Sequence, residues 1–317
     1  MAKYQRDRKR PRSRRQSRSN ALLFVRLTIL LLLIWAGNNV GRAREADKEN
    51  ISALMQSEQE LTVHFIDVGQ GDSILIQCAN HAMLIDAGDN SKGTTVQLYL
   101  QKQGVQKLDY LIGTHPDADH IGGLDVVITK FDCETVMMPE VTKENATYRD
   151  VVSAMEYRNY KNTVPAVGAE YGLGDARFTI VAPNRDYEES YNNYSIGILL
   201  VYGENRFLFT GDAEAEAEED MLSNGISLQA DVLKIAHHGS ITSSGGAFLD
   251  AVSPTYAVIS CGEGNDYGHP HSETLNSLRQ RGIKVFRTDE QGSIVVTSNG
   301  KELIWNCAPS ESWQSGR

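Results

Sequence analysis

Short apolar runs, separated by turns rich in Gly, Asp and Asn, fill the chain from Leu61 onward, and this rhythm limits the fold more than any other feature. Most runs have the length of strands, and stretches with helical character follow them in blocks. Such blocks predict two packed sheets with helices outside, an α/β sandwich of four layers in one domain over 61–307, before a tail at 308–317. The predicted strands are 61–68, 73–78, 82–87, 108–114, 177–182, 195–203, 206–212, 230–236, 255–261, 284–288 and 293–298, and the predicted helices are 94–103, 144–160, 245–252 and 271–281.

The formal net charge of −10 conceals two oppositely charged parts. Residues 1–20 contain nine Lys or Arg against one acid, whereas the chain from Asn38 onward contains 21 basic and 40 acidic residues, a formal charge of −19. A hydrophobic share of 41% and a charged share of 23% exclude a mainly disordered or collagen-like chain. The 4 scattered cysteines are too few for a disulfide scaffold. The chain thus joins a basic tail to an acidic globular body.

The two parts are joined by an apolar stretch, 21–37, which contains a single charge, Arg26. Its length is near the lower limit for a membrane-spanning helix, and the positive-inside rule places residues 1–20 in the cytoplasm. We therefore expect a single-pass anchor in the cell membrane, a polar linker at 38–60 and an extracellular body. A cleaved signal peptide, which would leave a secreted body, is the alternative. No protein partner can be inferred.

The densest cluster of ionisable side chains lies in THPDADHIGG, residues 114–123, directly after an apolar strand and before a pair of glycines. Imidazole and carboxylate groups are ligands for Zn²⁺, Mn²⁺ or Fe²⁺. Such groups this close together would repel one another or lack partners without a cation, so we favour a metal site over a solvated acidic loop. The four residues are His115, Asp117, Asp119 and His120.

These residues resemble the HxHxDH metal motif of the metallo-β-lactamase superfamily, with Asp117 in place of the second His. The HxDxDH variant resembles the hydrolase domain of ComEC-type competence proteins. The resemblance implies the metallo-β-lactamase fold and metal-dependent hydrolysis. ComEC-type proteins also carry many transmembrane helices for DNA transport, and the single apolar stretch here gives no support for that role. The likeness covers nearly all of 61–300, through HFIDVGQGDSILI (64–76), MLIDAGDN (83–90), FLFTGD (207–212), LKIAHHGSITSS (233–244) and NDYGHPHSETLNSL (265–278).

The resemblance assigns two metal positions to the cluster and to Asp212. The first position takes His115, Asp117 and Asp212, and the second takes Asp119, His120 and Asp212. Because Asp212 follows a glycine at the end of a predicted strand, its side chain is free to point outward. An N-cap of the following helix is the alternative function for Asp212.

A further ligand should come from His237 or His238, which follow a predicted strand. Alternation along that strand would send them to opposite sides, so only one should reach the metal, and which one is open. The superfamily's third-motif histidine is missing, because no histidine occurs between His120 and His237. Asn192 or Asn193 is the nearest polar candidate to replace it as a ligand. Oxygen ligands in place of imidazoles weaken the first position, so we expect one or two ions, with Mn²⁺ competing with Zn²⁺.

Three further roles complete the expected site. Asp119 could take a proton from the nucleophilic water, in addition to binding metal. His269, after another strand end, is expected to act on the leaving group or to bind phosphate, and Lys234 is expected to hold an anionic oxygen. Asp72 is expected either to orient a ligand histidine or to bond local backbone amides.

These features together predict an exported, metal-dependent hydrolase whose ion lowers the pKa of water to about 7. The ComEC resemblance points to phosphodiester bonds in DNA or in a small phosphoester, although a body with a charge of −19 disfavours tight, nonspecific binding of DNA. Two alternatives stay open. One is hydrolysis of a cell-surface ester, lactone or phosphorylated polymer, and the other is a non-catalytic binding module that keeps the fold.

Overall fold

The computed structural model describes residues 60–188 and 190–316, which form two β-sheets with helices packed against them. The predicted basic tail at 1–20, membrane segment at 21–37 and linker at 38–60 lie outside these residues, apart from Glu60. Within the described part of the chain, no helix is both long enough and apolar enough to cross a membrane.

The first sheet has eight strands in the order β15-β14-β1-β2-β3-β4-β5-β6. It begins as an antiparallel meander from β1 to β3 and continues as parallel strands from β3 to β6. Helices form the crossovers of the parallel part, as such connections require. The strands are β1 (Leu61–Phe65), β2 (Ile74–Cys78), β3 (His81–Ile85), β4 (Lys107–Ile112), β5 (Asp132–Met137), β6 (Asn162–Thr163), β14 (Ile294–Ser298) and β15 (Leu303–Trp305).

The second sheet has seven strands in the order β13-β12-β11-β10-β9-β8-β7. Strands β7 to β10 pair antiparallel, and β10 to β13 pair parallel. Both sheets therefore combine a hairpin part with a parallel part. The strands are β7 (Glu170–Leu173), β8 (Ala176–Ala182), β9 (Gly197–Tyr202), β10 (Asn205–Phe209), β11 (Val232–Lys234), β12 (Tyr256–Ile259) and β13 (Lys284–Arg287).

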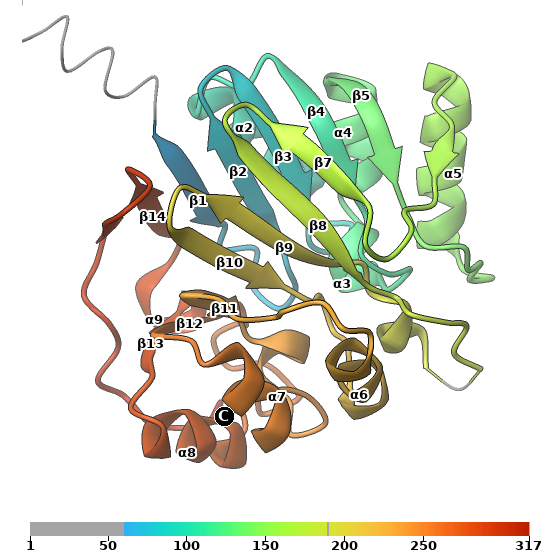
Figure 1. Cartoon of the computed structure of the whole chain (residues 1–317). Coiled ribbons are helices and arrows are strands. Elements are labelled where there is room, and N and C mark those ends of the chain that lie inside the picture. Colours follow the sequence, from blue (N-terminus) through green and yellow to red (C-terminus); the bar gives the residue numbers. More distant parts are fainter. Residues whose placement is uncertain (1–59, 189, 317) are drawn as a thin grey trace, which may run out of the picture. The chain divides into compact units, whose positions relative to one another are not determined.

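Helices cover the outer face of each sheet, which gives the four layers that the sequence predicts (Figure 1). Apolar residues of α2, α4 and α5 pack on the first sheet, and those of α6, α7 and α8 pack on the second. The helices are α2 (Gly93–Lys102), α3 (Ala118–Ile121), α4 (Leu124–Lys130), α5 (Ala146–Arg158), α6 (Ala215–Ser223), α7 (Gly246–Val252), α8 (Ser272–Gln280) and α9 (Thr288–Gln291), with 3-10 turns η1 (Tyr191–Tyr194) and η2 (Ala236–Gly239).

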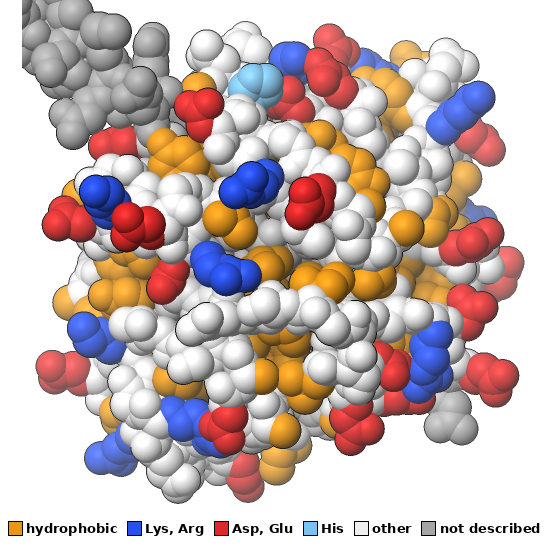
Figure 2. Space-filling model, in the orientation of Figure 1, with side chains coloured by type: hydrophobic (Ala, Val, Ile, Leu, Met, Phe, Trp, Pro, Cys, Tyr) orange, Lys and Arg blue, Asp and Glu red, His pale blue; other side chains and the backbone are white. Residues whose placement is uncertain are grey.

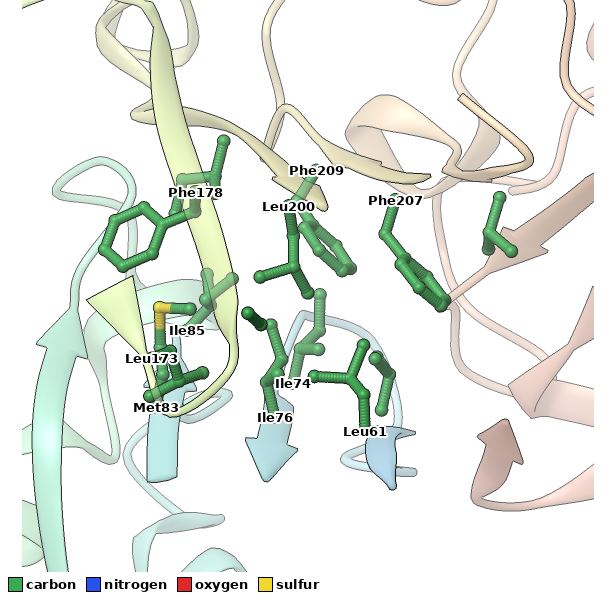
Figure 3. Close-up of a cluster of buried hydrophobic side chains, with 14 of the residues drawn as sticks. Leu61, Ile74, Ile76, Met83, Ile85, Leu173, Phe178, Leu200, Phe207 and Phe209 are labelled. Carbon is green, nitrogen blue, oxygen red and sulfur yellow. The ribbon is translucent and has the colours of Figure 1, made fainter. Parts of the chain in front are cut away.

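The inner faces of the two sheets pack against each other through a dry apolar layer (Figure 3). Successive side chains of a strand point to opposite faces, so alternate residues of β1 and β2 enter this layer. Leu200 and Phe207 of the second sheet are completely buried there. This layer fixes the two sheets relative to each other and so sets where the loops at their ends lie.

All the predicted strands and helices are present, with ends shifted by a few residues. The strands β5, β6, β7 and β15 were not predicted. In β5, Asp132 and Glu134 alternate with buried residues, so the run does not read as apolar although it pairs in parallel with β4. The C-terminal tail predicted at 308–317 contacts the rest of the domain, since Ser310 N donates to Val285 O at 2.7 Å.

Removing a buried leucine from the layer between the sheets should cost much of the stability of the domain. We expect Leu200→Ala to lower the free energy of unfolding by about 2–5 kcal/mol, because a cavity replaces a fully buried side chain. The matched change Leu98→Ala, at a residue that is 57% exposed on α2, should alter it by about 0.5 kcal/mol or less. Urea denaturation measures both, and equal losses would contradict this account of the core.

Candidate metal centre

The predicted site residues lie on loops that follow strands of both sheets. His115 follows β4, and the short helix α3 carries Asp119 and His120. Asp212 follows β10, and His238 lies in the turn η2 after β11. In sheets of this kind, the loops after parallel strands gather at one edge. Residues that are far apart in the sequence therefore meet at one place.

Four side-chain atoms converge on one small space. Nε2 of His120 lies 3.3 Å from Nε2 of His238. Oδ2 of Asp212 lies 3.2 Å from the first nitrogen and 3.4 Å from the second. Oδ2 of Asp119 lies 3.3 Å from Nε2 of His238. The structure thus brings two imidazoles and two carboxylates, taken from three distant stretches of the chain, to one point.

Each of the two facing imidazoles is anchored through its other ring nitrogen. Nδ1 of His120 lies 2.8 Å from Oδ2 of Asp86, and Nδ1 of His238 lies 2.9 Å from the carbonyl oxygen of Ser260. A carboxylate and a carbonyl only accept, so each Nδ1 carries hydrogen and each Nε2 of a neutral ring presents a lone pair. Two lone pairs at 3.3 Å repel each other unless a cation lies between the rings. The set of N and O donors therefore fits a divalent metal ion.

The charges around these atoms favour a cation. Burial opposes ionisation of His120 and His238, but Asp212 outweighs burial and holds the pKa of both rings well above its usual value. Burial likewise opposes the charge of Asp212 and Asp119, and the two histidines outweigh it, so both carboxyl pKa values lie well below the usual range. The carboxylates are ionised at neutral pH, and a metal ion would displace protons from this centre.

Asp72 lies behind this centre rather than in it. One atom of its carboxylate is within 4.8 Å of atoms of His120, Asp212 and His238, which would make it a fourth ligand. However, its Oδ1 lies 3.4 Å from Nδ1 of His238, the nitrogen that faces away from the converging atoms. Its Oδ2 accepts a hydrogen bond of 2.7 Å from Nζ of Lys234. We infer that Asp72 helps to orient the His238 ring, which is one of the two roles expected for it from the sequence.

Lys234 is completely buried, and its surroundings differ from the expectation that it holds an anionic oxygen of the substrate. Its ammonium donates to Asp72 and, at 3.0 Å, to the carbonyl oxygen of Ile235. The residue does not line the pocket over the centre. Lys234 therefore neutralises a buried carboxylate. No pattern around Lys234 predicts this partner, because Asp72 lies 162 residues away in the sequence.

His115 and Asp212 are the two residues of the first expected metal position that are buried beside the cluster. Burial and the neighbouring His120 lower the pKa of His115 to about 4, so its ring is neutral. Its Nδ1 lies 3.1 Å from Oγ1 of Thr114, whereas its Nε2 is buried and has no hydrogen-bond partner among the described residues. Within the same part of the chain, Oδ1 of Asp212 is also buried without a partner. Buried polar atoms are seldom left unpaired, so each of these two atoms is free to bind a ligand.

Asp117, the third member of that position, points elsewhere. Its carboxylate accepts a hydrogen bond of 2.7 Å from Nζ of Lys143, at the side of the pocket. Of the two asparagines proposed as further ligands, Asn192 lines the pocket, whereas Asn193 is buried, donates to the carboxylate of Glu216 and accepts from Glu214 N. The first position therefore has fewer donors in place than the second.

Asp86 is a site residue that the sequence analysis missed. It is completely buried after β3, and it accepts hydrogen bonds from Thr114 N at 2.8 Å, Thr114 Oγ1 at 2.7 Å and His120 Nδ1. Through Thr114 Oγ1 it also reaches Nδ1 of His115. One carboxylate thus orients both histidines of the cluster, as partners of metal-binding histidines do. The available signal was an acid at the end of a buried strand, in MLIDAGDN.

Of the two adjacent histidines, His238 is the one that reaches the converging atoms. The strand β11 ends at Lys234, and both histidines have left-handed backbone angles, with φ of 48° at His237 and 54° at His238. The argument from strand alternation is therefore wrong, because neither histidine lies in the strand. The two rings nevertheless face different partners. Nε2 of His237 lies 3.9 Å from Asp212, and its Nδ1 faces Glu214 at 3.5 Å.

The backbone at Asp212 joins the two sheets. Helix α6 is preceded by Glu214 as its N-cap, so the alternative that Asp212 caps this helix is wrong. Asp212 N donates to Oγ of Ser195 at 3.0 Å. Gly211 has a φ of +51°, and a Cβ there would lie 2.8 Å from that Oγ and 3.1 Å from Cβ of Thr114. Only glycine fits at this contact.

A polar pocket of about 130 Å³ lies over the centre. His269 belongs to it, and burial together with His238 and His237 lowers its pKa to about 4, so the ring is neutral near pH 7. A larger cavity of about 610 Å³, on the outer face of the second sheet, contains none of the site residues. The smaller pocket is therefore the one whose lining residues could take part in a reaction. Its lining residues are Gln70, Asp117, Asp119, Asn192, Asp212, His237, His238, Tyr267 and His269.

Comparison with known proteins identifies the class that the fold and the centre define. The metallo-beta-lactamase superfamily description matches residues 66–263, and the chain belongs to that superfamily, whose members are generally metal-dependent hydrolases. Among solved structures, the metallo-beta-lactamase fold protein YhfI from Bacillus subtilis has a TM-score of 0.52 at 12% identity, and the match covers 76% of this chain and 100% of that one. At this identity the likeness shows the fold alone.

Curated relatives narrow the class and confirm the expected resemblance to ComEC-type competence proteins. ComE operon protein 3 of Bacillus subtilis is 31% identical over 262 residues, which are 77% of this chain and 34% of that protein. Competence protein ComA of Neisseria gonorrhoeae is 33% identical over 239 residues, 75% of this chain and 32% of that protein. The chain thus spans about a third of the length of these relatives.

Loss of the Asp212 carboxylate or of the His238 ring should abolish tight metal binding. We expect Asp212→Asn and His238→Asn to remove the stoichiometric Zn²⁺ or Mn²⁺ that calorimetry detects, and His237→Asn to retain it, since only His238 faces Nε2 of His120. The affinity should fall as the pH is lowered, because protons compete for the same atoms. The exposed carboxylate Asp250, paired with Arg281, provides the control Asp250→Asn. Retained binding in the Asp212 variant would contradict the assignment.

Removing Lys234 should act on stability. Burial opposes the charge on Asp72, but Lys234 outweighs it, with His238 adding to the effect, and lowers the pKa of Asp72 to about 2. We expect Lys234→Met to cost about 3–5 kcal/mol at pH 7, because it leaves a buried charge unpaired. The double change with Asp72→Asn should recover much of this loss.

The pH dependence follows from the same pair. Because the pKa of Asp72 is lower in the folded chain than its usual 3.8, its stabilising contribution is complete above about pH 4 and disappears as the pH falls toward 2. Denaturation curves over that range would show the wild type losing this contribution. A Lys234→Met protein that is as stable as the wild type at pH 7 would contradict the structural role.

Proposed function

We propose that the chain is a metal-dependent hydrolase of phosphodiester bonds. The observation that carries the proposal is the convergence of Nε2 of His120, Nε2 of His238 and Oδ2 of Asp212 within 3.4 Å of one another, at the base of a polar pocket. Membership of the superfamily supports hydrolysis, and the relation to competence proteins supports a nucleic-acid or phosphoester substrate. When bound, a divalent ion supplies Lewis-acid polarisation and lowers the pKa of water to about 7.

The residues of the chain supply the rest of the chemistry. Asp119 is ionised and its side chain is 34% exposed toward the pocket, so it can accept the proton of an attacking water. Asp212, His120 and His238 are the residues that would hold the metal ion near the scissile group. His269, on the far loop of the pocket, is a neutral ring that can hydrogen-bond to the leaving group. Hydrolysis by this route needs no covalent intermediate.

Surface charge argues for a local rather than an extended contact with substrate. On the face shown in Figure 2, basic and acidic side chains are interspersed, and apolar side chains lie between them. Among the described residues on that face, no large basic patch is present that would bind a polyanion nonspecifically. The pocket itself is small, at about 130 Å³. We therefore favour recognition of one phosphodiester group in the pocket over wrapping of long DNA.

We also propose that the domain works outside the cell, attached to the membrane by the apolar stretch 21–37. Its support is the sequence alone: the nine basic residues within 1–20 precede that stretch, and the acidic body follows it. Protease protection in intact cells would test this arrangement. Digestion of the domain only after the membrane is broken would contradict it.

Turnover of a simple phosphodiester is the direct test of the activity. With Mn²⁺ or Zn²⁺ restored, the chain should hydrolyse bis-p-nitrophenyl phosphate, and Asp119→Ala should lower kcat by roughly 100-fold or more, as loss of a general base does. Single-stranded DNA and a β-lactam or ester substrate complete the assay. Hydrolysis of the ester but of no phosphodiester would favour the cell-surface ester alternative, and metal binding without any turnover would favour a binding module.

A further inference from the structure

The hydrogen position on His269 decides what this residue can do in the pocket. Its backbone is held by one side chain, since His269 N donates to Oδ1 of Asn265 at 3.0 Å and Nδ2 of Asn265 donates to His269 O at 2.6 Å. On the ring, Nδ1 lies 3.4 Å from Nε2 of Gln70. Among the described residues, Nε2 of His269 has no hydrogen-bond partner, so it is free for a ligand in the pocket.

The orientation of the Gln70 amide follows from its other partner. Gly262 N lies 3.2 Å from Oε1 of Gln70. A backbone N–H only donates, so the atom facing it is the oxygen, and the amide NH₂ faces His269. The contact is tight, because a Cβ on Gly262 would lie 2.7 Å from Gln70 N. Rotation of the amide by 180° would set two donors against each other at Gly262.

An NH₂ group also only donates, which fixes the role of the ring nitrogen beside it. Nδ1 of His269 must accept the hydrogen bond from Gln70, so a neutral ring carries its hydrogen on Nε2. The nitrogen directed away from Gln70 is then an N–H group. His269 is thereby prepared as a donor to an electron-rich atom, unlike His120 and His238, whose Nε2 atoms carry lone pairs when those rings are neutral.

We propose that Gln70 is a positioning residue that sets the tautomer of His269, so that Nε2–H donates a hydrogen bond to the leaving-group oxygen of the phosphodiester. This inference rests on the proposed function. As the bond between phosphorus and that oxygen breaks, negative charge develops on the oxygen, and a fixed donor stabilises it without giving up its proton. Gln70 acts through His269 and need not touch the substrate.

The substitution Gln70→Glu separates the two contacts of the amide. A carboxylate still accepts from Gly262 N, but it offers His269 an acceptor in place of a donor, so the hydrogen of the neutral ring moves from Nε2 to Nδ1. Nitrogen-15 NMR of the full chain, with the His269 signals assigned from their loss in His269→Gln, reads the tautomer directly. We expect an unprotonated Nδ1 and a protonated Nε2 in the wild type, and a protonated Nδ1 and an unprotonated Nε2 in Gln70→Glu. A protonated Nδ1 in the wild type, or identical spectra, would overturn the proposal.

Kinetics test the consequence for catalysis. We expect Gln70→Glu to lower kcat on bis-p-nitrophenyl phosphate roughly tenfold, the value of one hydrogen bond, with a smaller change in KM. The loss should be larger for diphenyl phosphate, because the more basic phenolate leaving group depends more on a donor. The matched change Gln77→Glu removes an amide that donates to Gln103 O at 3.2 Å, away from the pocket, and should leave both rates unchanged.

The outcomes separate this proposal from the proposed function. If the wild type hydrolyses no phosphodiester, the function is wrong, and the NMR measurement still decides the role of Gln70 in setting the tautomer. If the wild type is active and Gln70→Glu shifts the tautomer but loses no activity on either substrate, the donor role of His269 is overturned. Equal losses on the two substrates would also contradict it.

Discussion

The centre depends on buried acceptors that hold the far side of each imidazole. Asp86 takes the Nδ1 hydrogen of His120, and the Ser260 carbonyl takes that of His238. Without these two bonds the rings could turn or exchange tautomers, and their Nε2 atoms would not face each other at 3.3 Å. The acceptors come from different sheets, so the layer between the sheets and the two bonds together define the place for an ion.

Negative charge is balanced at two positions, one among the converging atoms and one behind His238. The acids Asp119 and Asp212 face the converging nitrogens, and the positive charge that they require comes from protons or from an ion. Behind His238, the charge of Asp72 is matched by Lys234 at 2.7 Å. A buried lysine at this point is costly by itself, but it allows another carboxylate to lie against the His238 ring without adding net charge.

Much of the architecture was predictable because the strands and helices of each layer have a recognisable pattern of apolar residues. Alternation in β1 and runs of apolar residues in β9 predicted strands, and the spacing of His115 to His120 predicted a metal site. Other features depend on contacts between distant residues. Nothing in the sequence near Lys234 shows that Asp72 lies beside it, and the left-handed turn at His237 replaces the strand geometry that the sequence indicated. The role of Asp86 likewise emerges only when β3 and β4 are paired.

The contact at Gly211 has a consequence for how a substrate enters. Gly211, from a loop of the second sheet, packs closely against Ser195 and against Thr114 of the first sheet, and Ile196 N donates to Thr114 O at 3.0 Å. The two sheets are held together next to Asp212, which lines the pocket, so they cannot separate at this contact to admit a bulky molecule. A substrate must instead enter past the other lining residues, among which Tyr267 and Asn192 lie on loops. Any change in selectivity between related chains would then be found in those loops, while the contact at Gly211 stays the same.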